Sequence, residues 1–303
     1  MSTIALRQVS RWYGNVVAAN DVTMTIGPGI TGLLGPNGAG KSTLIAMMSG
    51  FLAPSTGTVT LDGQPVWRHP EVYARIGLVP EVEAMYDMVT GWQLVLANAR
   101  LHRLPDPELA ARTALETVAM TDAQDRTVGT YSKGMKQRVK MATALVHDPA
   151  VLLLDEPFTG MDPRQRLHLM DLLRSLGSQG RTVLFSSHIL EEVEEIADTI
   201  EVLVAGRHAA SGDYRRIRRL MTERPHQYTI SSGDNRRLAA ALLADGAADT
   251  VDLTGGDLAV QTTDFGRFTR ALPRLARDAG IDLHEVNPAD ESLESVFAYL
   301  VAR

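Results

Sequence analysis

The most constraining stretch of this chain is a loop formed by Gly35, Pro36, Asn37, Gly38, Ala39, Gly40, Lys41, Ser42 and Thr43. It fits G-x-x-x-x-G-K-[ST], a pattern whose glycines let several backbone N–H groups point at one anion. An apolar run at 30–34 precedes the loop and a helix-forming run at 43–48 follows it. This context predicts a phosphate-binding loop, in which Lys41 reaches the β- and γ-phosphates of a nucleotide and Ser42 binds Mg²⁺. A glycine-rich turn ahead of a helix is the alternative.

Composition limits the class of protein. A chain of 303 residues, 45% of them hydrophobic, is long enough for two domains with substantial cores. The formal net charge of −6 gives no sign of nucleic-acid affinity, and the absence of cysteine excludes disulfides and thiolate metal sites. Residues 1–11 lack the apolar core of a signal peptide, and no run approaches the roughly 18 apolar residues of a membrane span. We therefore expect a protein that neither spans a membrane nor binds nucleic acid.

Two apolar runs end in polar side chains that suit catalysis. Asp155 and Glu156 follow the run at 151–154, and His188 follows the run at 182–187. Continuous apolar runs are typical of parallel strands covered on both faces, and open α/β sheets bind ligands at the carboxyl ends of such strands. Asp155 is predicted to hold Mg²⁺ through water, and Glu156 to face an attacking water. The alternatives are an acidic N-cap of the next helix and a structural or solvated histidine.

Two further side chains follow predicted strands. Tyr13 lies on a turn within the β-structure of 4–26, where its ring would stack on a purine or pack on its own hairpin. Glu81 follows a short apolar strand at 76–80.

The segment at 85–148 changes to helical periodicity. Ser132 and Gly134 open its last helix, which runs over 135–146, and Ser132 suits the N-cap. Asp162 ends a Gly-Met-Asp turn that leads into another predicted helix. We expect these turns to place their polar residues at helix N-termini.

A change in charge marks a boundary near residue 220. Residues 1–219 carry 22 basic and 23 acidic side chains, whereas residues 220–303 carry 8 basic and 13 acidic ones. Beyond the boundary the elements read strand, helix, strand, strand, helix, strand, followed by a final helix at 292–302. The order βαββαβ predicts a small α+β, ferredoxin-like C-terminal domain over 220–303.

Over roughly residues 1–215, these motifs resemble the nucleotide-binding subunits of ABC transporters. Tyr13 resembles the adenine-stacking aromatic of that family, and the loop at 35–43 resembles its Walker A motif. The strand that ends in Asp155 and Glu156 is similar to Walker B, and His188 is similar to the switch histidine.

The family signature, usually written LSGGQ, resembles Tyr131-Ser132-Lys133-Gly134-Met135, and Asp162 resembles the D-loop aspartate. The segment at 291–297 resembles the C-terminal end of the drug- and lipid-exporting branch. Three positions depart from the family pattern: Lys133 replaces a glycine, Met135 replaces a glutamine, and Glu81 stands where the family usually has a glutamine. These departures leave the hydrolysis rate open.

The resemblance implies an α/β P-loop NTPase fold of ABC type over 1–219, with a mixed sheet core, an antiparallel β subdomain and a helical subdomain at about 85–148. It implies an ATPase that forms a homodimer with ATP between the phosphate loop of one chain and Ser132 and Gly134 of the other, and Asp162 would also contact the nucleotide. Glu156 and His188 would be catalytic, and Ser42, Glu81 and Asp155 would hold Mg²⁺. The partner would be a transmembrane permease, contacted near Met85, Tyr86 and Met88, and this chain would lie on the cytoplasmic face of the cell membrane, peripheral through that permease.

Two other functions fit part of the sequence. A soluble ABC-type ATPase acting on ribosomes or DNA would share the nucleotide motifs, but the tandem cassettes, coiled coils or basic extensions of such proteins are not visible here. A P-loop kinase would explain the loop at 35–43, but not Ser132, Gly134 and His188.

Overall fold

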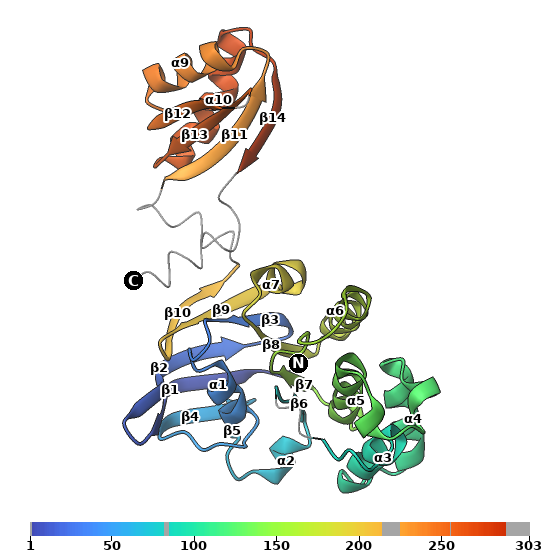
Figure 1. Cartoon of the computed structure of the whole chain (residues 1–303). Coiled ribbons are helices and arrows are strands. Elements are labelled where there is room, and N and C mark those ends of the chain that lie inside the picture. The colour runs from blue at the N-terminus through green and yellow to red at the C-terminus, as the bar shows by residue number, and fades with distance from the viewer. Residues whose placement is uncertain (1, 82–84, 214–224, 255, 289–303) are drawn as a thin grey trace. The chain divides into compact units, whose positions relative to one another are not determined.

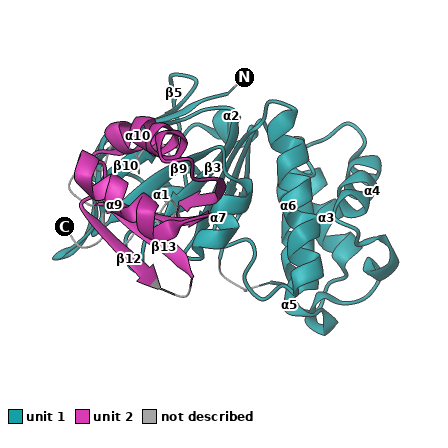
Figure 2. Cartoon of the chain, turned by 90° about the horizontal axis from the view of Figure 1, so that it is seen from above, with its two compact units in different colours: residues 1–211 teal, residues 212–303 magenta. Residues whose placement is uncertain are grey.

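The computed structural model describes residues 2–81, 85–213, 225–254 and 256–288. The chain divides into two compact units, Met1–Ser211 and Gly212–Arg303, coloured separately in Figure 2. The domain boundary expected after residue 219 and the helix expected at 292–302 lie outside the described residues. Each unit is therefore described by itself.

The first unit is built on a six-stranded sheet (Figure 1), whose described strands have the order β10-β9-β3-β8-β7-β6. Pairing is parallel between β3 and β8, β3 and β9, β7 and β8, and β6 and β7. Every residue of β7 and β8 is buried, as the continuous apolar runs predicted. The strands are β3 (Gly29–Leu34), β6 (Ile76–Val79), β7 (Val151–Leu154), β8 (Thr182–Ser187), β9 (Thr199–Val204) and β10 (Arg207–Gly212).

An antiparallel sheet completes this unit, with the order β2-β1-β4-β5. Its inward residues join the apolar residues of β3, β7 and the first helix in one core cluster. The predicted turn at Gly14 connects β1 and β2, and Asp62 and Gly63 connect β4 and β5. The strands are β1 (Ile4–Tyr13), β2 (Val16–Ile26), β4 (Thr56–Leu61) and β5 (Gln64–Pro65).

Side-chain caps fix where the helices of this unit begin. Thr90 forms a capping box at α3, and Asp106, Ser132 and Asp162 each accept a hydrogen bond from the third residue beyond them, at α4, α5 and α6. Helices α3, α4 and α5 pack on one another and form the helical subdomain (Figure 1). The helices are α1 (Lys41–Met48), α2 (Pro70–Tyr73), α3 (Gly91–Leu101), α4 (Pro107–Thr117), α5 (Lys133–Leu145), α6 (Pro163–Ser178) and α7 (Leu190–Ile196).

The second unit confirms the predicted βαββαβ order. Its strands pair antiparallel in the order β12-β13-β11-β14, and Ile230, Leu258 and Phe268 lie in the core that α9 and α10 form with the sheet. This is a ferredoxin-like arrangement. The elements are β11 (His226–Ser232), α9 (Asn235–Asp245), β12 (Thr250–Thr254), β13 (Asp257–Thr262), α10 (Phe265–Asp278) and β14 (Leu283–Pro288).

Candidate nucleotide site

The loop at 35–43 joins the buried strand β3 to α1, which begins at Lys41. Gly38 and Gly40 have φ values of +80° and +101°, a region that favours glycine. A Cβ added to Gly40 would lie 2.2 Å from the carbonyl oxygen of Ala18. The strand–loop–helix context predicted from the sequence is confirmed, and the N-terminus of α1 opens onto the loop.

Lys41 is buried against its own loop. Its Nζ donates to the carbonyl oxygen of Gly35 at 2.8 Å and lies 3.7 Å from Oε1 of Glu156. Ser42 and Asn37 are exposed, and Thr43 is half-buried. The ammonium group therefore lies between the phosphate loop and the acid at the end of another strand.

Asp155 and Glu156 follow β7 directly and are both buried. The fully buried Ser186, on the neighbouring strand β8, donates through Oγ to Oδ1 of Asp155 at 2.6 Å. Oγ of Ser186 also accepts from the backbone N–H of Glu156 at 2.9 Å. Glu156 has φ +49°, uncommon for a residue with a side chain. Ser186 thus fixes both acids, and the sequence analysis did not identify it.

His188 follows β8 and reaches the same acid. Its Nδ1 lies 2.9 Å from Oε2 of Glu156, and about half of its side chain is exposed. Strand β8 lies between β3 and β7 in the sheet, so the loops after these three strands meet at one edge. The structure therefore brings Lys41, Glu156 and His188 together, from segments far apart in the sequence.

Ser132, Gly134 and Asp162 lie at the N-termini of α5 and α6. Ser132 and Asp162 are exposed and cap α5 and α6, accepting from the N–H of Met135 at 3.3 Å and of Gln165 at 2.8 Å. Gly134 lies directly against Gln165, because a Cβ there would come within 1.8 Å of Oε1 of Gln165. Among the described residues, neither Ser132 nor Asp162 bonds to Lys41, Glu156 or His188.

Glu81 is exposed just beyond β6. It shares a small cavity with Glu156, and the other lining residues are Lys133, Lys136, Gln137, Lys140 and Thr159. The Nζ of Lys140 donates to the carbonyl oxygen of Pro80 at 3.1 Å, beside this cavity. Glu81, which departs from the family's usual glutamine, therefore lines the same cavity as Glu156, the predicted catalytic acid.

Tyr13 ends β1 opposite Val16 and has 48% of its surface exposed. The guanidinium carbon of Arg11 lies 4.8 Å from its ring centroid, a cation–π contact within the hairpin. The ring thus makes a contact with its own strand and keeps an exposed surface on which a purine could stack.

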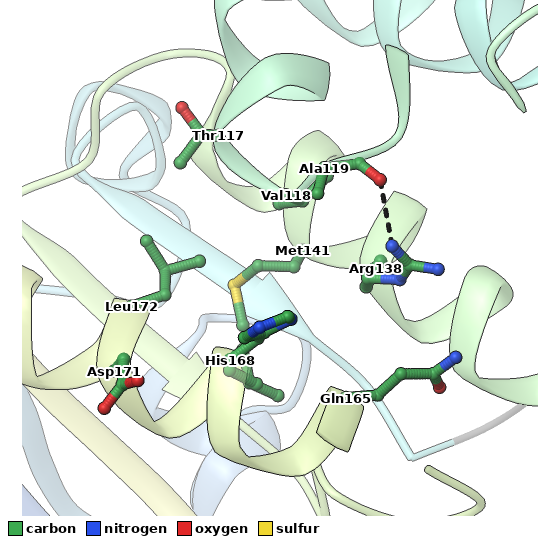
Figure 3. A pocket seen from close by; sticks show the side chains of 10 residues that line it. Thr117, Val118, Ala119, Arg138, Met141, Gln165, His168, Asp171 and Leu172 are labelled. Carbon is green, nitrogen blue, oxygen red and sulfur yellow. Dashed lines mark hydrogen bonds between the residues drawn. The ribbon is translucent and has the colours of Figure 1, made fainter. Parts of the chain in front are cut away.

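A separate cavity of about 340 Å³ lies between α4, α5 and α6 (Figure 3). Arg138 lines it and donates through Nη1 to the carbonyl oxygen of Ala119 at 2.9 Å, as the dashed line shows. Met141 and Leu172 contribute apolar lining. None of the predicted nucleotide-binding residues lines this cavity, so it is distinct from the site at the phosphate loop.

A phosphate loop and a buried acid pair that meet at one edge of a parallel sheet define the class of this protein: a P-loop nucleoside triphosphatase. Residues 19–159 match the sequence model of the family described as ABC transporter. The chain belongs to the ABC transporter family and is an ATP-binding subunit of it, as the motifs predicted. Among the described residues, no helix combines the length and apolarity needed to cross a bilayer.

Three relatives show how much of the chain this family likeness covers. A daunorubicin resistance ATP-binding protein of Streptomyces coeruleorubidus is 34% identical over 99% of this chain and 96% of its own. A linearmycin resistance ATP-binding protein of Bacillus subtilis (strain 168) is 30% identical over 97% of each chain. An uncharacterized ABC transporter ATP-binding protein of Nostoc sp. is 41% identical over 69% of this chain, but only 65% of its own length is matched.

Solved structures support the fold of the first unit. An ATP-binding subunit of an ABC transporter gives a TM-score of 0.66 at 29% identity, covering 71% of this chain and 92% of its own. A dimeric bacterial ABC transporter cassette gives a TM-score of 0.65 at 22% identity, covering 69% of this chain and 98% of its own. The predicted ABC-type fold is confirmed.

Proposed function

We propose that this chain binds and hydrolyses ATP to power a separate membrane permease, and that the permease is an exporter. The observation that carries the proposal is the convergence of Lys41, Glu156 and His188, with Glu156 within 3.7 Å of Lys41 and 2.9 Å of His188. These groups come from three adjacent strand ends, where a bound triphosphate would meet a cation, a base and a hydrogen-bonding ring.

Each of the three groups has a distinct role in this proposal. Lys41 neutralises charge on the β- and γ-phosphates, and its present partners are loop carbonyl oxygens that a phosphate can replace. Glu156 orients the attacking water. His188 contacts the γ-phosphate through the exposed part of its ring, while Nδ1 bonds to Glu156. Positioning and charge neutralisation carry most of a phosphoryl transfer, so small displacements of these groups matter.

Mg²⁺ fits the oxygens that the chain presents here. The hydroxyl of Ser42 is exposed in the first turn of α1, and Asp155 uses Oδ1 for Ser186, which leaves Oδ2 without a described partner. Hydroxyl and carboxylate oxygens are the ligands that Mg²⁺ prefers, together with substrate phosphates. When bound, the ion would neutralise charge on the phosphates, and Glu81, which lines a cavity with Glu156, is a further candidate ligand.

A homodimer completes the site in this proposal. Ser132 and Asp162 are exposed at helix N-termini and do not bond to Lys41, Glu156 or His188 among the described residues. Helix N-termini favour anions. In a dimer, Ser132, Gly134 and Asp162 of one chain would face the nucleotide on the phosphate loop of the other. A dimeric cassette with the same fold supports this arrangement.

The proposal of export rests on the names of the relatives, and the proposal of a peripheral membrane location rests on an exposed apolar surface. Relatives that span nearly the whole chain are named as drug resistance ATP-binding proteins, which favours export over action on ribosomes or DNA. Tyr86 and Met88 are 75% and 90% exposed, next to the half-buried Met85. Exposed apolar side chains of this kind mark interaction surfaces, and we assign this one to the permease.

Glu156→Gln tests the function. The variant should bind ATP as the parent does, hydrolyse it at least about a hundredfold more slowly, and accumulate as an ATP-bound dimer in size-exclusion chromatography. Glu195→Gln, at an exposed acid on α7, is the matched control and should behave like the parent. Near-normal turnover by Glu156→Gln would exclude Glu156 as the catalytic acid, and co-purification with ribosomes or DNA rather than a membrane protein would favour the alternative.

A further inference from the structure

A second buried carboxylate lies behind His188. Glu192, in the first turn of α7, is only 4% exposed. Its Oε2 accepts from the Oγ of Ser187 at 2.7 Å, and that hydroxyl in turn accepts from the N–H of Ile189 at 2.9 Å. Ser187 and Ile189 are the residues on either side of His188, so Glu192 fixes the backbone that carries this histidine.

The other oxygen of Glu192 faces a different element. Oε1 lies 3.5 Å from Nη1 of Arg166, which is in the first turn of α6. The N–H of Arg166 donates to the carbonyl oxygen of Asp162 at 2.9 Å. One carboxylate therefore links the turn that carries Asp162 to the segment that carries His188.

The environment of Glu192 is costly for a carboxylate. Burial raises its pKa, while the hydrogen bond from Ser187 and the charge of Arg166 act in the opposite direction. The nearby charges of Glu156 and His188 also act on its pKa, in opposite senses. A carboxylate buried in an ion pair contributes little net stability compared with an apolar residue of the same size, so stability alone does not account for Glu192.

We infer that Glu192 is a positioning residue for His188, and that the Arg166–Glu192 ion pair couples the position of the Asp162 turn to the position of His188. This rests on the proposed function, in which Asp162 faces the nucleotide of the partner chain and His188 contacts the nucleotide of its own. A shift of the Asp162 turn on dimer closure would move Arg166, and through Glu192 it would move the backbone beside His188. The pair would thereby make hydrolysis at one site depend on the state of the other.

The same two helices supply a matched control. Arg174 on α6 and Glu195 on α7 form an ion pair at 3.3 Å, with both side chains more than 40% exposed. This pair has the same charges and joins the same helices, but within the described part of the chain it has no hydrogen bond or ion pair to Ser187, His188 or Ile189. Glu195→Gln therefore removes an α6–α7 ion pair without disturbing the His188 segment.

The test measures steady-state hydrolysis as a function of ATP concentration for the full chain and for Glu192→Gln, Arg166→Gln, the double variant and Glu195→Gln. Glu192→Gln keeps the shape of the side chain and an oxygen for Ser187, but loses the charge. We expect kcat to fall about tenfold with the Kd for ATP within about twofold, and the Hill coefficient to fall toward one. The double variant should match the single variants, because all three break one interaction.

A folded Glu192→Gln protein with the kcat and Hill coefficient of Glu195→Gln would overturn the inference, as would additive effects of the two single variants. If Glu192→Gln fails to fold, Arg166→Gln decides alone, since that side chain is 37% exposed and tolerates truncation better. Glu156→Gln, measured alongside, separates the two proposals. Near-normal turnover by Glu156→Gln would refute the proposed role of Glu156, whereas an inactive Glu156→Gln with a normal Arg166→Gln would refute only the coupling.

Discussion

Ser186→Ala removes one hydroxyl from the floor of the nucleotide site. That hydroxyl is fully buried, donates to Oδ1 of Asp155 at 2.6 Å and accepts from the N–H of Glu156 at 2.9 Å. Alanine fits the same space, so the change removes two hydrogen bonds without creating a steric clash. Both bonds hold residues that we assign to hydrolysis.

The magnitude follows from the two bonds. A hydrogen bond to a carboxylate is worth about 1.5–3 kcal/mol, and a buried N–H left without an acceptor costs about 1–3 kcal/mol. We expect the free energy of unfolding to fall by roughly 3 kcal/mol, which lowers the melting temperature by about 6–12 °C in a domain of this size. Turnover should fall by about tenfold to a hundredfold, because Glu156 at φ +49° loses the contact that fixes its backbone.

Thermal unfolding and steady-state phosphate release, measured on the same preparations, check both numbers. Ser178→Ala is the control. The exposed hydroxyl of Ser178 also donates to a protein oxygen, the carbonyl oxygen of Ser175 at 2.8 Å, but among the described residues it does not bond to Asp155 or Glu156. We expect the Kd for ATP without Mg²⁺ to stay near that of the parent, because the phosphate loop is untouched. A Ser186→Ala protein with the melting temperature and kcat of Ser178→Ala would refute the role given to this hydroxyl.

Three further changes test other parts of the argument. Gly40→Ala should abolish ATP binding in calorimetry, because its Cβ would lie 2.2 Å from the carbonyl oxygen of Ala18 at φ +101°; retained binding would contradict the loop geometry. Glu81→Gln should stay active and bind ATP with less dependence on Mg²⁺ than the parent, since an amide adds no charge beside the phosphates; identical Mg²⁺ dependence would place Glu81 outside the site. Burial lowers the pKa of His147 to about 4, so the folded state favours the neutral ring, and stability should be lost as pH falls from about 6.5 toward 4. Urea unfolding at pH 7.5 and 5 should show a smaller loss in His147→Gln, and an equal loss would exclude this histidine as the cause.

The sequence was sufficient for features whose chemistry is local. The loop at 35–43 has its glycines, its lysine and its flanking strand and helix within a few residues of one another, and the structure confirms that context. Ser132 caps α5 as predicted because a cap involves only its own first turn. The buried strands β7 and β8 were equally clear, because a parallel strand covered on both faces leaves a continuous apolar run.

Other features depend on which elements become neighbours. In the sequence, Ser186 is one more residue at the end of an apolar run. Its bonds to Asp155 and Glu156 form because β8 lies beside β7 in the sheet. Strand β10 was not predicted, because its small and polar residues have low strand propensity and it forms by pairing with β9.

Helix α7 shows, within a single element, both a feature that the sequence determines and one that the packing determines. Its four glutamates, Glu191, Glu192, Glu194 and Glu195, are alike in the sequence, and among them only Glu192 is buried, against Ser187 and Arg166. The sequence determined that the helix would be acidic, since composition is a local property. The tertiary structure decided which acid lies beside the segment that carries His188, because the docking of α7 against β3, β8 and α6 sets the face that turns inward.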